Sequence, residues 1–94
     1  MNRKVQRYVF DVSVPAEEVE NTLLLAVLAA EGLHGQARVL LDASYSFDAE
    51  KHACVIDTES DVGRDICRMF TGFATREFGE AAFSIRRADD EPDA

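Results

Sequence analysis

Apolar residues recur at every third or fourth position between Ser60 and Gly79, which is the spacing of an amphipathic helix. The residues on its expected buried face are Val62, Ile66, Met69, Phe70 and Phe73. Three small residues line one flank of that face, namely Gly63, Cys67 and Ala74, and they favour the close approach of a second helix. Because this stretch also holds the densest group of aromatic residues, we expect the core to form around it.

Four further stretches alternate apolar and polar residues, which is the pattern of half-buried strands. They cover residues 5–14, 36–45, 52–57 and 82–87. The inward-facing residues of the first and last strands are expected to be Tyr8, Phe10, Val12, Phe83 and Ile85. The polar residues 46–51 then form a hairpin loop between the second and third strands.

A helix is predicted between the first two strands. Pro15 suits its first turn, where a backbone donor is not needed, and Glu17 and Glu18 complement the positive end of the helix dipole. The helix should run to about Glu31, ahead of glycines at positions 32 and 35. Between residues 22 and 30 large apolar groups occupy more than one face of this helix. Either the second helix or another chain must cover the excess.

The predicted order of elements is strand, helix, strand, strand, helix, strand. Two right-handed βαβ crossovers joined by a hairpin produce a four-stranded antiparallel sheet in the order 4-1-3-2, with both helices on one face. This arrangement is the ferredoxin-like α/β sandwich. Residues 1–88 would form this single domain, and residues 89–94, which include four acids and no large apolar side chain, are predicted to be a disordered tail.

Such a fold leaves one face of the sheet uncovered. The outward apolar residues nearest its centre are expected to be Val9, Leu40 and Val55. The same register predicts a row of alternating charges across the strands, in the order Arg38, Asp57, Arg7 and Arg86. Opposite charges on neighbouring strands contribute about 0.2–1 kcal/mol each, so sheet stabilisation alone also explains this row. An apolar band edged by charges favours contact with a second copy of the chain, a different protein or a small apolar ligand.

The composition narrows the classes of function. The chain of 94 residues has a net charge of −8, which disfavours binding to nucleic acid. No apolar run approaches the ~20 residues that span a bilayer, and no secretory signal opens the chain, so we expect a cytoplasmic protein with no membrane segment. Cys54 and Cys67 lie within apolar patterns, not in a metal-binding or redox spacing, and are predicted to be buried thiols.

Motifs that identify an activity are absent: the sequence has no nucleophile elbow, phosphate-binding loop or dinucleotide-binding turn. The candidates for holding a small ligand are His52, Arg64 and Arg68. At the start of the second helix, capping by Ser60 or Asp61 is favoured over anion binding, because Glu59 and Asp61 would repel an anion. A metal site needs three or four ligands, and at most two can be named around His52, so neither a metal nor a cofactor is predicted. The aspartates that end strands are candidates for a general base, but turn chemistry favours aspartate at the same positions. Catalytic residues therefore stay unassigned.

These observations predict a small non-catalytic binding or assembly module that forms a homodimer through its open sheet face. The alternative is a small dimeric ferredoxin-like enzyme or ligand-binding protein with a pocket between sheet and helices. A third hypothesis is a partner subunit whose acidic tail docks on a basic protein.

Overall fold

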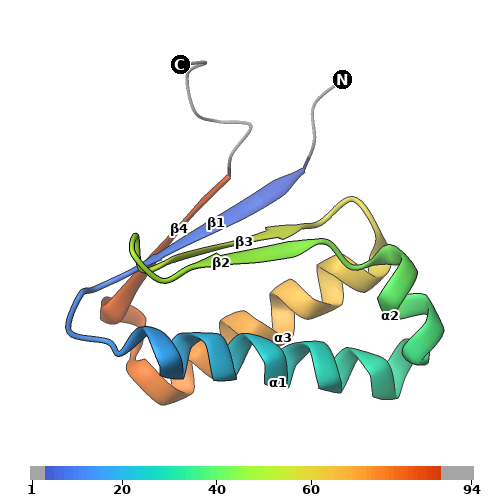
Figure 1. Ribbon diagram of the computed structural model, residues 1–94, viewed down its shortest axis with the longest axis horizontal. Coiled ribbons are helices and arrows are strands. Elements are labelled where there is room, and N and C mark those ends of the chain that lie inside the picture. The colour runs from blue at the N-terminus through green and yellow to red at the C-terminus, as the bar shows by residue number, and fades with distance from the viewer. Residues whose placement is uncertain (1–3, 88–94) are drawn as a thin grey trace.

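The computed structural model describes residues 4–87 of the chain (Figure 1). Its elements, in chain order, are β1 (Val5–Phe10), α1 (Ala16–His34), α2 (Gln36–Asp42), β2 (Tyr45–Asp48), β3 (Ala53–Asp57), α3 (Asp61–Phe78), a 3₁₀ turn (Glu80–Ala82) and β4 (Phe83–Arg87). The described residues therefore form an α+β architecture with four strands and three α-helices. The predicted acidic tail, residues 89–94, lies outside them.

The four strands form one antiparallel sheet in the order β2-β3-β1-β4. This is the expected order 4-1-3-2 read from the opposite edge. The helices α1 and α3 pack side by side against one face of the sheet, and α2 lies at the end of this layer, where the chain turns back into β2 (Figure 1). No helix covers the other face within residues 4–87.

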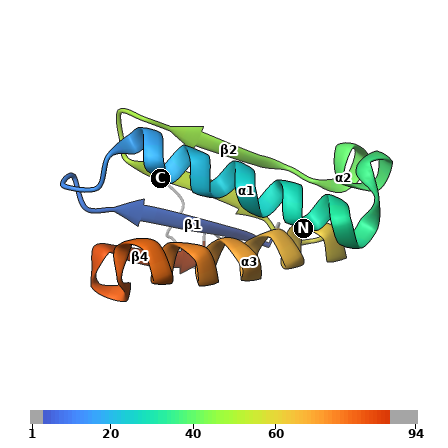
Figure 2. The same ribbon diagram turned by 90° about the horizontal axis from the view of Figure 1, so that it is seen from below.

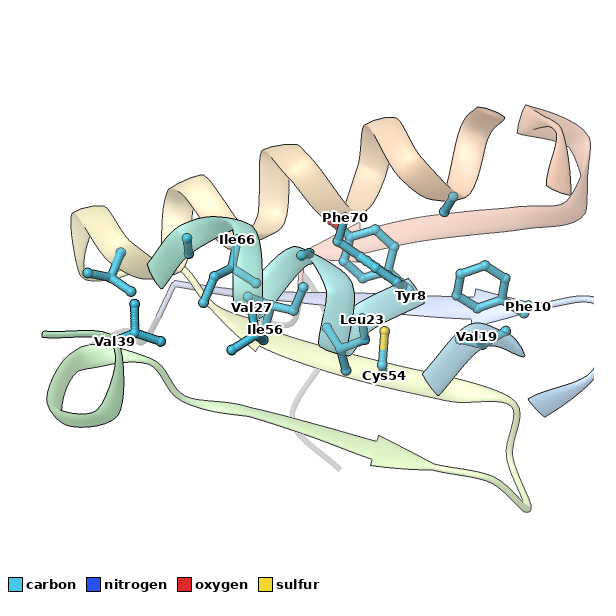
Figure 3. Close-up of a cluster of buried hydrophobic side chains, with 14 of the residues drawn as sticks. Tyr8, Phe10, Val19, Leu23, Val27, Val39, Cys54, Ile56, Ile66 and Phe70 are labelled. Atoms are coloured by element: carbon cyan, nitrogen blue, oxygen red, sulfur yellow. The ribbon is translucent and has the colours of Figure 1, made fainter. Parts of the chain in front are cut away.

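The core fills the space between the sheet and the two long helices. Two aromatic rings from β1, those of Tyr8 and Phe10, lie edge to face with the ring of Phe70 on α3 (Figure 3). The ring centroids are 4.8 Å apart for Tyr8 and Phe70 and 6.0 Å apart for Phe10 and Phe70. Leu23 of α1 and Ile56 of β3 close the centre, and both are fully buried.

The amphipathic helix predicted around Phe70 is confirmed as α3. Its buried residues are Val62, Gly63, Ile66, Phe70 and Ala74, and Met69 and Phe73 pack against the core while staying partly exposed. The hydroxyl oxygen of Ser60 caps the helix by accepting a hydrogen bond of 3.0 Å from the backbone N–H of Gly63. At the other end Gly79 adopts a φ of 87°, a conformation that favours glycine and stops the helix.

The strand predicted over residues 36–45 is wrong. After α1 continues to His34, Gly35 takes a φ of 88° and the chain begins a second, shorter helix, α2. An ion pair between two residues one helical turn apart, Arg38 and Asp42, stabilises that helix, with 3.2 Å between the charged groups. Val39 is the one residue of this helix that is buried. The strand β2 follows only at Tyr45–Asp48. Consequently none of the outward residues assigned to this strand lies on the sheet.

The first strand is also shorter than predicted, because β1 ends at Phe10. The carboxylate of Asp11 accepts a hydrogen bond of 2.9 Å from the backbone N–H of Ser13, and this turn leads the chain out of the sheet. Val12 is therefore 81% exposed and does not face the core. Ile85 pairs with Tyr8 on the helix side of the sheet, as expected, but it stays half exposed because β4 is an edge strand.

Candidate interaction surfaces

The open face of the sheet carries the side chains that alternate with the buried ones. Tyr8 is buried against the helices, so its neighbours Arg7 and Val9 point to the opposite face. Residues paired across the strands share a face, which adds Val5, Ser46, Asp48, Ala53, Val55, Asp57, Ser84 and Arg86. Val9 is 41% exposed and Val55 is half-buried. Two of the three residues predicted for the apolar centre, Val9 and Val55, thus lie on this face.

The predicted row of alternating charges is wrong for two reasons: Arg38 lies on α2 and not on a strand, and Asp57 is not opposite Arg7. Arg7 lies directly opposite Arg86 on β4 and opposite Val55 on β3. Asp57 pairs with Val5 instead, one row along the sheet. The open face is therefore basic over β1 and β4, where Arg7 and Arg86 lie, and acidic over β2 and β3, where Asp48 and Asp57 lie.

Leu40 and Arg38 belong to α2 and are absent from the sheet. Arg38 bridges two elements, since its guanidinium donates to Asp42 on α2 at 3.2 Å and to Asp61 at the start of α3 at 2.8 Å. Leu40 is 82% exposed. It is one of several large apolar side chains that α1 and α2 leave uncovered; the others are Leu24, Leu25, Leu28, Leu33 and Leu41. The excess of apolar residues noted in the first helix is thus not covered by α3.

Two grooves are each lined by one of these leucines, Leu40 in the first and Leu25 in the second. The first, which we call the α1–α2 groove, has a volume of about 500 Å³ and is lined by Val27, Glu31, Gln36, Ala37, Val39, Leu40, Ala43 and Tyr45. The second runs between α1 and α3, has a volume of about 460 Å³ and is lined by Glu18, Asn21, Thr22, Leu25, Phe73, Arg76 and Glu77. Both grooves lie on the outside of the molecule and are bounded by helices.

His52 lies in the turn between β2 and β3, with a φ of 49° that is rare for a residue other than glycine. Its ring nitrogen Nδ1 is buried and has no hydrogen-bond partner among residues 4–87. Asp48, at the end of β2, uses its carboxylate to accept hydrogen bonds from the backbone N–H groups of Glu50 and Lys51. Hydrogen bonds from Ser13 lower the pKa of Asp11, and the proximity of His52 lowers it further. Within residues 4–87, no three metal-binding side chains are grouped closely enough to hold an ion.

The other two candidate ligand-binding residues lie on α3, beyond the opposite end of β3 from His52. Arg64 donates to the backbone carbonyl oxygens of Thr58 at 3.3 Å and Glu59 at 3.1 Å. Arg68 lies 3.7 Å from the carboxylate of Asp65. The structure therefore does not bring these three candidate residues together into one site.

One polar contact was missed because the sequence pattern gave no signal for it. The predicted helix stops at about Glu31, but α1 continues to His34, whose Nε2 lies 2.8 Å from the carboxylate of Asp65 on α3. Together with the bond from Arg38 to Asp61, this contact ties all three helices together at one end of the helical layer. Both contacts join residues that are more than twenty positions apart, so local spacing cannot reveal them.

A buried hydroxyl network links β1 to α3. The hydroxyl of Tyr8 lies 2.6 Å from Thr71 Oγ1 and 2.9 Å from Cys67 Sγ. The carbonyl oxygen of Cys67 lies within hydrogen-bond distance of both hydroxyls, at 2.7 Å from Thr71 and 3.3 Å from Tyr8, and either hydroxyl can donate in the bond between Tyr8 and Thr71. Burial raises the pKa of Tyr8, and its hydrogen bond with Cys67 adds to the rise. Burial likewise raises the pKa of Cys54 to about 12.

These raised pKa values predict a loss of stability in alkaline solution. The unfolded chain releases the same protons near the ordinary pKa values, about 8.5 for cysteine and about 10 for tyrosine. Above these values the unfolded state binds fewer protons than the folded state, so the free energy of unfolding falls as pH rises. Each group contributes a slope of up to about 1.4 kcal/mol per pH unit. Urea unfolding at a series of pH values from 7 upward should show the decline starting near pH 9, more gently in Cys54→Ala; a profile identical in both proteins contradicts the role of Cys54.

Comparison with known protein families, with curated proteins and with solved structures finds no match to this chain. Within residues 4–87, none of the helices combines the length and the apolar character that crossing a membrane requires.

Proposed function

We propose that this chain is a small non-catalytic assembly module with a ferredoxin-like fold, which self-associates through the open face of its sheet. The strand order β2-β3-β1-β4 and the placement of α1 and α3 on one face support the fold assignment. In this interpretation α2 is an insertion between α1 and β2, and it leaves the two βαβ crossovers unchanged.

The observation that carries the proposal is the layout of the open face. Val9 and Val55 form an apolar centre, with basic residues over β1 and β4 and acidic residues over β2 and β3. A twofold axis that runs between two copies, parallel to the strands, places β4 of one copy over β2 of the other. The basic half of each face then meets the acidic half of its partner, so this face is complementary to itself in charge.

The alternative function, an enzyme with a pocket between sheet and helices, has less support. The space between these layers is occupied by apolar side chains such as Tyr8, Leu23 and Phe70, each at most 1% exposed. Within this space the Tyr8 hydroxyl already bonds to Thr71. The α1–α2 and α1–α3 grooves lie outside this space, on the surface of the molecule.

Replacing Val9 by aspartate should convert a dimer into a folded monomer, because it places a charge at the apolar centre of the proposed interface. Light scattering across a range of concentrations measures the mass, and circular dichroism reports whether the variant is folded. Val12→Asp is the matched control, since Val12 lies in the turn after β1, is 81% exposed and is absent from the open face. It should leave the dimer intact. A wild-type chain that stays monomeric at high concentration, or a dimer that survives Val9→Asp, would refute the proposed interface.

A further inference from the structure

The outer surface of α1 presents leucines that nothing in the described chain covers. Leu24 and Leu28 lie one helical turn apart and are 45% and 61% exposed. They border the α1–α2 groove, because Val27 and Glu31, which line it, each follow one of these leucines by three positions. Across the groove, Leu40 of α2 is 82% exposed. Figure 2 shows α1 from the helix side, with β2 and α2 along the flank that faces away from α3.

The charges around this apolar surface are of one sign. Along its full length α1 carries four glutamates, at positions 17, 18, 20 and 31, and neither lysine nor arginine. Glu20 lies one turn before Leu24, and Glu31 lies one turn after Leu28 within the groove itself. No ion pair engages these glutamates within residues 4–87. Arg38, the one cationic side chain of α2, is already held by Asp42 and Asp61.

These charges identify the kind of occupant. A second copy of the chain would bring glutamates against glutamates, and like charges across an interface are unfavourable. An occupant with apolar anchors and flanking lysines or arginines would satisfy both features of the surface. A groove between two helices suits the apolar face of an amphipathic helix, with anchors three and four positions apart. We propose that the α1–α2 groove binds a basic amphipathic helix of a partner protein.

The direct test uses a synthetic peptide of leucine and lysine, about 18 residues long, or roughly five helical turns. One tryptophan replaces a leucine on its apolar face; the chain itself contains no tryptophan, so the fluorescence reports on the peptide alone. Titration with the full chain should give a saturable blue shift at one peptide per chain, weakened by added salt. A peptide with glutamate in place of lysine should not bind.

Two neighbouring leucines of α2 provide matched variants. Leu40→Gln removes an apolar side chain that lines the groove, and affinity should fall by about tenfold to a hundredfold. Leu41→Gln alters a side chain that is equally exposed, at 81%, but is not among those lining the groove, so affinity should not change. Both positions are solvent-exposed, so both variants should fold. Val9→Asp should also leave binding unchanged, which separates this test from that of the sheet-face dimer.

Several results would overturn the proposal. Equal effects of Leu40→Gln and Leu41→Gln would mean that the peptide does not sit in the groove. If a peptide with serine in place of leucine binds equally well, charge alone accounts for the contact. If a peptide with a central proline binds equally well, the bound peptide is not a helix. If the peptide fails to bind and Leu40→Gln converts a dimer into a monomer, the occupant is a second copy of the chain.

Discussion

Replacing Gly63 by alanine should lower the free energy of unfolding by about 3 kcal/mol, although alanine is the better helix former. A Cβ atom at this position would overlap the backbone carbonyl oxygen of Asp57, at the end of β3. Neither the backbone of Asp57 nor that of Gly63 can shift easily, because hydrogen bonds hold both. The N–H of Asp57 is bonded to the carbonyl oxygen of Ser44 at 2.9 Å, and the N–H of Gly63 is bonded to the capping hydroxyl of Ser60. The first turn of α3 would have to move away from the sheet.

Gly72→Ala is the matched control within the same helix, because a Cβ atom there meets nothing within 4 Å. This change should raise the free energy of unfolding by up to about 1 kcal/mol, since glycine is costly inside a helix. Urea and thermal unfolding followed by circular dichroism measure both variants. For a chain of this size 1 kcal/mol corresponds to roughly 4–8 °C in Tm. Equal stabilities of Gly63→Ala and Gly72→Ala would contradict the close approach of α3 to β3.

Gly63 also shows how far a sequence pattern can be taken. Its position beside the apolar stripe of α3 indicated correctly that a small residue was required there. The pattern assigned the close neighbour to a second helix, whereas the structure gives it to the end of β3. A periodic pattern identifies the face of a helix that is crowded, but it carries no information on which distant segment supplies the contact.

The error over residues 36–45 has a different physical cause. A segment of seven residues spans barely two turns of helix, and over that length alternation of polar and apolar residues fits a strand as well. Local interactions decide the outcome. Gly35, with its positive φ, redirects the chain so that a new helix begins, Arg38 pairs with Asp42, and Val39 is the one residue of α2 that is buried. Because Leu40 lies on α2 and not on the sheet, the sheet face contains only two of the three apolar residues predicted for its centre.

Whether the other interface residues were predicted correctly depends on the kind of sequence pattern behind each prediction. Val9 and Val55 lie on the open face because alternation along a single strand fixes the face of each residue. The charge row failed because it also required the register between strands, which the sequence does not encode locally. The excess of leucines in α1 was visible from composition along the helix. That excess could be explained by α3 or by another chain, and only the packed structure shows that α3 leaves Leu24 and Leu28 exposed.

Phe70→Ala should lower the free energy of unfolding by about 3–5 kcal/mol, which approaches the whole stability of many small domains. Phe70 is fully buried at the point where α3 meets β1. Its ring lies edge to face with two other aromatic rings, those of Tyr8 and Phe10. Truncation therefore removes the transfer energy of the ring, leaves a cavity in the centre of the core and ends two favourable aromatic contacts. A midpoint of urea unfolding lower than that of any other variant described above is expected.

Phe73→Ala tests whether this loss comes from the core and not from helix α3 as such. Phe73 lies three positions along the same helix, but it is only partly buried and borders the α1–α3 groove. Its truncation opens that groove to water and creates no closed cavity, so the loss should be well under half of that for Phe70→Ala. Equal losses at the two positions would mean that the stripe of α3 is uniformly buried. In that case a partner or a second copy must cover the α1–α3 groove in solution, because the described chain does not.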